Sequence, residues 1–589
     1  MQSLIEALEE QVKKAFAEAG YDASYGRVGV SNRPDLCEYQ CNGAMPLAKQ
    51  VREKPIDIAQ KVAGYLADAT AFSAAEAVMP GFINLTLSEG FVASYVSELR
   101  EDASLGMQRF LEGETIVLDY GGPNIAKPLH VGHLRSAVIG ESMKRILRFA
   151  GARVIGDIHM GDWGLPIGLV ARELSARHPD WAYFDASHEG GFPKEAPFTV
   201  SELEEVYPAA SAKSKEDADY RADAMEMTRR LQQGDKGLRA LWHAIMEISK
   251  ADLKKVYDWL HVTFDLWKGE ADVDADIAPM IEELKRDGIA HESDGALVID
   301  VRLDDDKKEI PPCIILKSDG ASLYATTDLA TIRQRMALHR PDRMVYLTDK
   351  RQEMHFVQVF RAARKARFVF PETELVHIGF GTVNGKDGKP YKTRDGGVPR
   401  LEHLLDEIRD AMVQRIRESD RGLGEEESAR VAEQVSVAAL KYADLSNQPA
   451  KDYIFDPEKF TAFEGDTGPY LLYTMVRIKS ILARYAEEGG DPESARIVPA
   501  DTAAHKALQL ALCAFPETVA HCAKEYSAHG LCAYLFGLSN ALNTFYHDTK
   551  ILTEEDPVKK EGYIALIGLV LRVLAQGIDL LGFSAPERM

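Results

Sequence analysis

Two histidines separated by two residues, in the string His130-Val131-Gly132-His133, are the strongest chemical feature of this chain. The string follows a buried-strand pattern at 115–120 and precedes a helical pattern at 134–150. It is therefore expected where a parallel strand turns into a helix, a place that suits phosphate groups because free backbone N–H groups point at the ligand. Both imidazoles could donate to one anion, and Gly132 lets a nucleotide approach the backbone. Surface histidines or a zinc pair are alternatives, although no acidic or cysteine ligand stands nearby.

A second candidate is the segment 320–330, in which Tyr324 and Asp328 lie one helical turn apart. Taken alone, the two residues could have a structural role at the start of a helix. A carboxylate beside an aromatic face would also suit a guanidinium group, which is a planar cation with five N–H donors.

A third candidate is the segment 383–397, which is rich in glycine and lysine. Its composition alone favours a surface hairpin. Lys392 and Arg394 within it could instead neutralise charge on a phosphate leaving group.

The elements that position these residues indicate an α/β fold. We predict a Rossmann-like, doubly wound parallel-sheet catalytic domain with insertions, a small N-terminal α+β domain and an all-α C-terminal helix-bundle domain. The predicted domains are residues 1–108, 109–400 and 401–589. An insertion at about 175–310 interrupts the sheet; its first part, 179–217, is charged and loop-like, and its second part has apolar residues at helical spacing.

Hydrophobic periodicity supports these predicted domains. In the N-terminal domain it predicts helices over 3–19 and 90–102 and a strand over 82–87. The predicted strands of the parallel sheet are 115–120, 153–158, 344–348 and 374–378. After about 398 strand signals vanish, and the predicted helices are 404–417, 427–445, 469–488, 502–525, 527–547 and 563–581.

Composition is that of a globular protein with an acidic balance. The net charge of −22 argues at first sight against a nucleic-acid partner, because phosphate binding depends on lysine and arginine. A large enzyme can nevertheless carry a local basic path on an acidic body. No apolar run approaches the roughly 20 residues that span a bilayer, and no secretory signal is evident. The six scattered cysteines fit a reducing compartment, so we expect a cytoplasmic protein without a membrane partner.

The motifs together resemble one family. The string from Pro123 to Ser136 is similar to the HIGH motif of class I aminoacyl-tRNA synthetases. Asp119-Tyr120, Pro123-Asn124 and Ala126-Lys127 resemble arginyl-tRNA synthetases in particular, as does Gly161-Asp162-Trp163-Gly164. The resemblance covers nearly the whole chain. The chain departs from many members at Leu165-Pro166, where they carry Thr-Gln, and at Gly121, where they carry Ser.

The resemblance implies an enzyme, an arginine–tRNA ligase. Such an enzyme forms arginyl-adenylate from L-arginine and ATP, with Mg²⁺ on the triphosphate, and then transfers arginine to the 3′ end of tRNA(Arg). Catalytic roles are implied for Lys127, His130, His133, Lys392 and Arg394. Contacts to ATP are implied for Pro128, His130, Gly132, His133 and Lys392, and contacts to arginine for Asp119, Asn124, Tyr324, Asp328 and Gln352. No resident metal site and no DNA partner are expected, and the family is usually monomeric.

One departure from the family's lysine pattern has an implied compensation. The segment 383–397 resembles a degenerate KMSKS loop that lacks the usual second lysine. Family members of this kind carry a lysine just before the HIGH motif, and Lys127 stands there. We infer that Lys127 reaches the phosphates from the opposite side and compensates electrostatically.

The terminal domains resemble the tRNA-binding parts of the family. Exposed aromatic side chains can stack on splayed loop bases, which gives Tyr470, Tyr473 and Tyr546 a possible anticodon role, together with the terminal Met589. By period alone these aromatics would be core residues of a helix bundle. Asn84 could contact a D-loop base, although an asparagine at a strand end can equally satisfy a turn.

Two other functions stay open on the sequence. One is an HxGH nucleotidyl transferase that makes a small-molecule conjugate, against which the N-terminal and all-α domains count. The other is a catalytically inactive RNA-binding relative, against which the intact Lys127, His130, His133, Asp328 and Lys392 count.

Overall fold

The N-terminal domain is a four-stranded antiparallel sheet covered by helices. The computed structural model describes the chain except residues 126–128, 130, 319, 392–399 and 419–423. A capping box between Ser3 and Glu6 starts the helix that the sequence predicts over 3–19. The strand order is β1-β2-β4-β3, with β1 Val28–Val30, β2 Tyr39–Cys41, β3 Phe72–Val78 and β4 Phe82–Leu87. The helices are α1 Leu4–Glu18, α2 Ala44–Val51, α3 Pro55–Leu66 and the exit helix α4 Glu89–Glu101.

The central domain is built on a parallel sheet in the order β11-β10-β5-β6, which confirms the predicted fold class. Its strands are β5 Thr115–Asp119, β6 Arg153–Asp157, β10 Arg343–Asp349 and β11 Glu374–Phe380. Helix α5, Val131–Phe149, connects β5 to β6, whereas β10 lies on the other side of β5. The sheet order therefore reverses beside β5, and ligands of open α/β sheets bind at such a switch point.

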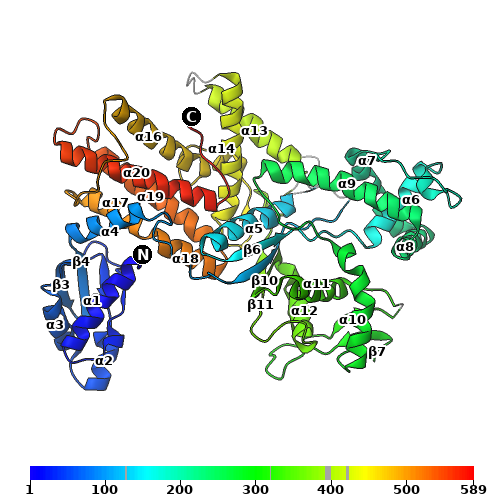
Figure 1. The fold of residues 1–589 in the computed structure, drawn as a ribbon, viewed down its shortest axis with the longest axis horizontal. Coiled ribbons are helices and arrows are strands. Elements are labelled where there is room, and N and C mark those ends of the chain that lie inside the picture. Colours follow the sequence, from blue (N-terminus) through cyan, green and yellow to red (C-terminus); the bar gives the residue numbers. More distant parts are fainter. Residues whose placement is uncertain (126–128, 130, 319, 392–399, 419–423) are drawn as a thin grey trace.

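The segments between β6 and β11 form two groups of elements (Figure 1). Four helices extend to one side: α6 Leu165–Arg177, α7 Val200–Glu216, α8 Ala218–Gln232 and α9 Lys236–Trp259. A second group packs nearer the sheet and comprises α10 Asp274–Arg286, β7 His291–Ser293, β8 Ala296–Ile299, β9 Cys313–Leu316, α11 Tyr324–His339 and α12 Glu353–Lys365.

One prediction within the insertion was wrong. Residues 179–217 looked charged and loop-like, but α7 occupies 200–216. Thr199 caps this helix, and Leu203, Val206 and Ala210 are buried on one face of it. Charged residues on the opposite face and a proline inside the helix hid the periodicity.

The C-terminal region is the predicted helix bundle, with one helix divided. The predicted helix over 502–525 is two helices that meet at Ala514, before Pro516. The helices are α13 Leu401–Glu418, α14 Glu425–Leu445, α15 Pro457–Phe460, α16 Gly468–Glu487, α17 Ala503–Cys513, α18 Phe515–Glu525, α19 His529–Asp548 and α20 Pro557–Leu580. By length and composition α20 could cross a membrane, but 67% of its most apolar window is buried within the protein.

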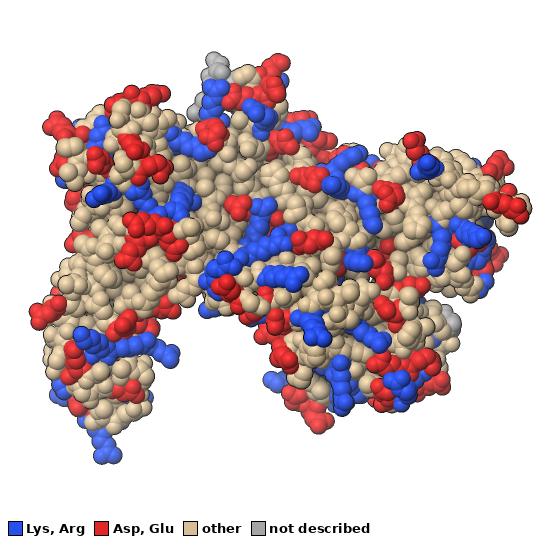
Figure 2. Space-filling view, in the orientation of Figure 1, with Lys and Arg blue, Asp and Glu red and all other residues tan. Residues whose placement is uncertain are grey.

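The N-terminal domain attaches to the bundle rather than to the parallel sheet (Figure 1). Arg100 of α4 donates to the carbonyls of Ala495, Pro492 and Glu493, and Lys506 forms an ion pair of 2.7 Å with Glu38. The surface carries interspersed charges, with a gathering of lysine and arginine over the region of α5 and β6 (Figure 2). The negative net charge is therefore unevenly distributed over this face.

Candidate active site

Two aspartates at the carboxyl ends of neighbouring strands share one buried arginine. Asp119 ends β5 and Asp157 ends β6, and an Nη atom of Arg335 lies 2.6 Å from the first carboxylate and 2.7 Å from the second. Burial raises the pKa of Asp119, against the opposing effect of Arg335. Asp119 is thus at the predicted place, but its carboxylate is already paired within the protein.

The start of α5 is fixed to the sheet through Gly121 and Ser136. The Gly121 backbone N–H donates to Ser136 Oγ at 2.8 Å, and Ser136 Oγ donates to the Leu347 carbonyl at 3.0 Å. Gly121 has φ +73°, a conformation that side chains other than glycine rarely adopt, and Tyr257 donates to its carbonyl at 2.6 Å. A serine would be strained here, and the backbone of Gly121 makes the polar contacts instead.

Asn124 lies against the Gly161-Asp162-Trp163-Gly164 segment. The Ile125 N–H donates to the Gly161 carbonyl at 3.0 Å, and the Gly161 N–H donates to the Pro123 carbonyl at 3.1 Å. A Cβ at Gly161 would lie 2.6 Å from Asn124 Oδ1, so only glycine lets the asparagine side chain lie there.

Leu165-Pro166 forms the first turn of α6, where proline is favoured because its missing N–H needs no partner.

Asp162 and Asp328 lie close enough to Glu270 for their charges to raise its pKa, and we call these three acidic side chains together the acidic pocket. Burial, together with the charges of Asp162 and Asp328, raises the pKa of Glu270 to about 7. Burial likewise raises the pKa of Asp162 to about 6. In the part of the chain that the structure describes, neither Asp162 nor Glu270 forms an ion pair with lysine or arginine. The pocket is therefore suited to a cation from outside the chain.

Tyr324 and Asp328 stand on the first turns of α11, the position at the start of a helix that the sequence left open as a structural alternative. Glu270 raises the pKa of Tyr324 after the larger effect of burial, which places the phenol close to the acidic pocket. His355 of α12 lies with Nε2 2.5 Å from Asp328 Oδ2, so one oxygen of this carboxylate already has a partner. Gln352, the remaining predicted arginine contact, is exposed in the short helix η4, Lys350–Gln352, between β10 and α12.

Several predicted catalytic residues lie outside the described residues: Lys127, Pro128, His130, Lys392 and Arg394. Gly132 and His133 are in the first turn of α5, at the switch point of the sheet. The Leu401 N–H donates to the Leu129 carbonyl at 2.8 Å, so these two described residues, one next to the HVGH string and one at the start of α13, lie together.

The predicted anticodon residues cluster on two helices of the bundle. Tyr470 and Tyr473 are on α16 and Tyr546 is on α19. The Arg477 guanidinium lies 5.0 Å from the ring centre of Tyr473 and 5.6 Å from that of Tyr546, and it donates to Asn543 at 2.8 Å. This group presents aromatic rings and a cation together, which suits RNA bases and phosphates.

The other two predicted tRNA contacts are placed differently. Met589 packs partly buried against the hydrophobic core, and ion pairs of Arg588 with Glu427 and of Glu587 with Lys479 hold the terminal segment.

Asn84 lies in the middle of β4 rather than at a strand end, and its Oδ1 accepts a hydrogen bond of 2.8 Å from Gln40. Only 9% of Asn84 is exposed, so a base would reach it only at an edge.

Three residues beside the predicted site residues were not predicted from the sequence. They are Arg335, which pairs with Asp119, Glu270 of the acidic pocket, and Arg477, which lies beside Tyr473. Arg335 could have been found, because it lies two helical turns after Asp328 on α11. Glu270 carried no motif, since a loop brings it to Asp162 from more than a hundred residues away. A Cβ at the preceding Gly269 would lie 2.5 Å from Asp162, which shows how closely that loop approaches.

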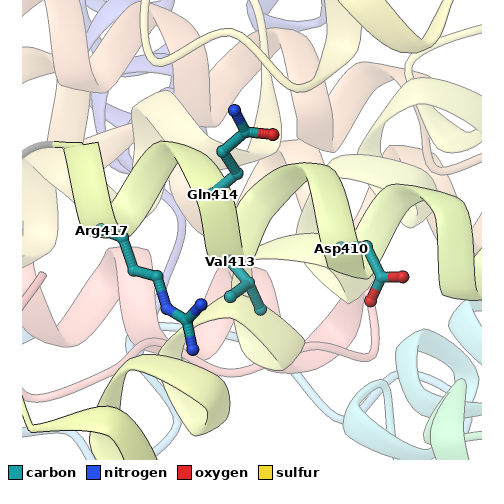
Figure 3. Close-up of a pocket in the computed structure, with 4 residues that line it drawn as sticks. All are labelled: Asp410, Val413, Gln414 and Arg417. Carbon is teal, nitrogen blue, oxygen red and sulfur yellow. The ribbon is translucent and has the colours of Figure 1, made fainter.

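A separate hollow of about 600 Å³ lies beside α13 (Figure 3). All of its lining residues come from that one helix, with Gln414 pointing away from Val413 and Arg417; they are Asp410, Val413, Gln414 and Arg417. It contains none of the predicted site residues.

Family models define the class to which this arrangement belongs. Residues 96–457 match the model described as tRNA synthetases class I (R), catalytic domain. Residues 471–589 match the DALR anticodon binding domain, and residues 2–87 match the arginyl tRNA synthetase N terminal domain. The parallel sheet with its switch-point site is thus the catalytic domain of a class I aminoacyl-tRNA synthetase.

Relatives narrow the class to one family. The chain is 55% identical to an arginine–tRNA ligase of Agathobacter rectalis and 49% identical to one of Alkaliphilus oremlandii, with 100% of both chains covered in each case. The chain belongs to the arginine–tRNA ligase family. The fold agrees with the arginyl-tRNA synthetases of Plasmodium falciparum and Thermus thermophilus, each 22% identical over 100% of both chains, with TM-scores of 0.81 and 0.79.

Proposed function

We propose that this chain ligates L-arginine to tRNA(Arg) in two steps, through an arginyl-adenylate. The observation that carries the proposal is the acidic pocket, because Asp162 and Glu270 are buried carboxylates that form no ion pair with lysine or arginine among the described residues, which matches a guanidinium substrate. Asp162 follows the carboxyl end of β6, at the edge of the parallel sheet where α5 also begins and where a nucleotide is expected, which supports the proposal.

The proposed arginine site uses the geometry of the pocket. Asp328 Oδ2 accepts a hydrogen bond from His355, so Oδ1 of the same carboxylate is the oxygen that would bind the guanidinium. Glu270 takes the other edge of the planar cation, and Tyr324 flanks it. Asn124, Asp119 and Gln352 would hold the amino and carboxylate end of the amino acid.

The proposed activation step needs no covalent enzyme intermediate. The arginine carboxylate attacks the α-phosphate of ATP, the bond to the β-phosphate breaks, and pyrophosphate leaves. Mg²⁺ bound to the triphosphate would neutralise part of its charge. His133 with His130, Lys127 and Lys392 stabilises the charge that develops, Arg394 assists at the pyrophosphate, and Pro128 and Gly132 border the nucleotide. In the second step the tRNA 3′ hydroxyl attacks the adenylate carbonyl and AMP leaves.

The proposed tRNA surface spans the two terminal domains. Tyr470, Tyr473 and Tyr546 stack on anticodon bases around Arg477. Met589 contributes from the terminal segment, which the pair of Glu587 with Lys479 joins to α16, and Asn84 contributes from the sheet of the N-terminal domain. We also propose that the enzyme acts as a cytoplasmic monomer without a DNA or membrane partner. The scattered cysteines support the compartment, and the family resemblance supports the monomer.

The test of this function is arginine-dependent ATP–pyrophosphate exchange, measured with and without tRNA. Exchange driven by arginine, followed by charging of tRNA, is the expected result. Exchange driven by another amino acid would contradict the substrate assignment. Nucleotide transfer without tRNA charging would favour the small-molecule transferase, and no exchange at all would favour an inactive RNA-binding relative.

The compensating role of Lys127 has its own test. Replacing it with alanine is expected to slow adenylate formation about 100-fold, because one cation at the phosphates is lost. Single-turnover formation of the adenylate measures this rate. An unchanged rate in Lys127→Ala would remove the idea that this lysine substitutes for the missing one of the loop.

A further inference from the structure

Arg135, one turn into α5, is a buried arginine that joins three parts of the molecule. Its side chain is 1% exposed, and Nε lies 3.1 Å from Asp444 Oδ2 at the end of α14. The same guanidinium donates through Nη1 to the carbonyl of Gly381, just after β11, at 3.0 Å and to the carbonyl of Lys451 at 2.9 Å. Its carbon lies 5.1 Å from the ring centre of Tyr453. The Arg135 guanidinium therefore joins helix α5 to the chain just after β11 and to the helical domain.

The helical domain reaches this point through the connection between α14 and α15, residues 446–456. This α14–α15 connection lies against the chain after β11, with parallel pairing between β12, Val383–Asn384, and β13, Tyr453–Ile454. Backbone hydrogen bonds continue the contact, from the Gly381 N–H to the Pro449 carbonyl at 2.9 Å and from the Phe455 N–H to the Asn384 carbonyl at 2.8 Å. The approach is close, because a Cβ at Gly381 would lie 2.5 Å from Asp452.

Asp452 of the same connection holds a second part of the candidate site. Its Oδ1 accepts the Thr382 N–H at 2.7 Å and lies 2.7 Å from Lys350 Nζ. Hydrogen bonding and charge from Lys350 lower the pKa of Asp452, so this carboxylate is ionised at neutral pH. Lys350 begins the short helix η4 that ends at Gln352, one of the proposed arginine contacts.

Three segments of the proposed activation site thus meet one connection of the helical domain. They are the first turns of α5 with Gly132 and His133, the chain from Gly381 to Asn384, and η4. Arg135 is suited to this task because its rigid fork binds several acceptors in fixed directions, which the single ammonium of lysine cannot reproduce.

We propose that Arg135 and Asp452 are positioning residues, through which the α14–α15 connection sets the relative placement of the nucleotide and arginine halves of the activation site. The inference rests on the proposed function, because it concerns the geometry of that reaction. Neither residue touches a reacting atom. Each acts by holding a segment that does, so a movement of the connection would change the rate of activation.

The two residues should have different kinetic signatures in arginine-dependent pyrophosphate exchange. Arg135→Lys is expected to lower kcat about 30-fold with the KM values for ATP and arginine within about twofold, because alignment rather than binding is lost. Asp452→Asn is expected to raise the arginine KM about fivefold with a smaller change in kcat, because η4 is released. A structural role alone would not separate kcat from KM in this way.

The matched control is Arg145→Lys. Arg145 is on the same helix and also joins it to the helical domain, through a pair of 2.8 Å with Asp579 of α20, but it contacts neither the strand exit nor η4. Its exchange kinetics should stay within about twofold of the original enzyme. Thermal unfolding and circular dichroism show whether each variant is folded.

The outcomes separate the inference from the proposed function. Absence of exchange in the unaltered enzyme would contradict the function itself. An active enzyme whose folded Arg135→Lys and Asp452→Asn variants keep both kcat and KM within twofold would overturn the inference, as would an equal loss in Arg145→Lys. Should Arg135→Lys fail to fold, Asp452→Asn decides alone, because Asp452 is half-exposed and its replacement keeps the side-chain size.

Discussion

Helix α5 and the acidic pocket both contain buried charges, but they arrange them in opposite ways. On α5, Arg135 lies against Asp444 and Lys144 lies 2.8 Å from Glu141, so each buried cation has a carboxylate partner. In the pocket, Glu270 and Asp162 gather at one place without an ion-pair partner among the described residues, and their pKa values are raised by burial.

The difference indicates what each region does. A buried pair satisfies its own charges and therefore serves to join elements in one geometry. Buried carboxylates that repel one another cost stability unless a ligand neutralises them, so they mark a binding site for a cation. Arg477 on α16 is the reverse case, a cation with ring and amide partners on a face proposed to bind RNA.

Among the tests of this contrast between α5 and the acidic pocket, the largest effect is expected at Asp328. Asp328→Ala is expected to lower kcat/KM for arginine about 1,000-fold, because a charge-assisted partner of the guanidinium is lost, while ATP binding changes little. Steady-state exchange kinetics measure the first, and equilibrium binding of ATP measures the second. Equal losses for both substrates would show that Asp328 supports the fold of the site rather than arginine binding.

The buried ion pair between Arg135 of α5 and Asp444 is tested by removing the carboxylate. Asp444→Ala leaves Arg135 buried without its carboxylate and is expected to reduce the free energy of unfolding by about 3 kcal/mol or more. Asp579→Ala removes an exposed partner of Arg145 and is expected to cost less than about 1 kcal/mol. Urea unfolding of the two variants provides the measurement. Similar losses in both would mean that burial does not distinguish the two pairs.

The acidic pocket, in which Asp162 and Glu270 form no ion pair among the described residues, is tested by varying the pH. The guanidinium binds the ionised carboxylates, whereas the raised pKa of Glu270, about 7, keeps this group partly protonated in the empty pocket at neutral pH. Protons therefore compete with arginine below pH 7, and the arginine KM is expected to fall about tenfold between pH 6 and 8 and then level off. Glu270→Gln should flatten the profile. A KM that is flat in the unaltered enzyme, or that rises with pH, would contradict an unpaired pocket.

The smallest effect is expected at Arg477, the cation on the face proposed to bind RNA. Arg477→Ala should raise the KM for tRNA about fivefold at moderate salt and leave pyrophosphate exchange unchanged, because a cation on the proposed anticodon surface is lost. Charging assays at several salt concentrations measure it. Arg484→Ala, in the last turn of the same helix, is the matched control. An equal effect of the control would indicate a general electrostatic contribution.

The sequence predicted the elements well where periodicity was strong. The parallel strands and the helices α5, α13, α14, α16, α19 and α20 follow from apolar spacing, since burial of one face is a local property of the pattern. It failed at α7, where charged residues masked a buried face, and at the junction of α17 and α18. The family assignment was confirmed because its motifs are contiguous strings of residues.

By itself, the sequence determined the class of chemistry and the place where the first strand of the parallel sheet turns into a helix, with His133 at the start of α5. Only the tertiary structure decided the partners. It paired Asp119 with Arg335, brought Glu270 to Asp328, and placed the α14–α15 connection against Arg135. The physical reason is that charges act through space and not along the chain, so residues hundreds of positions apart set one another's protonation and orientation.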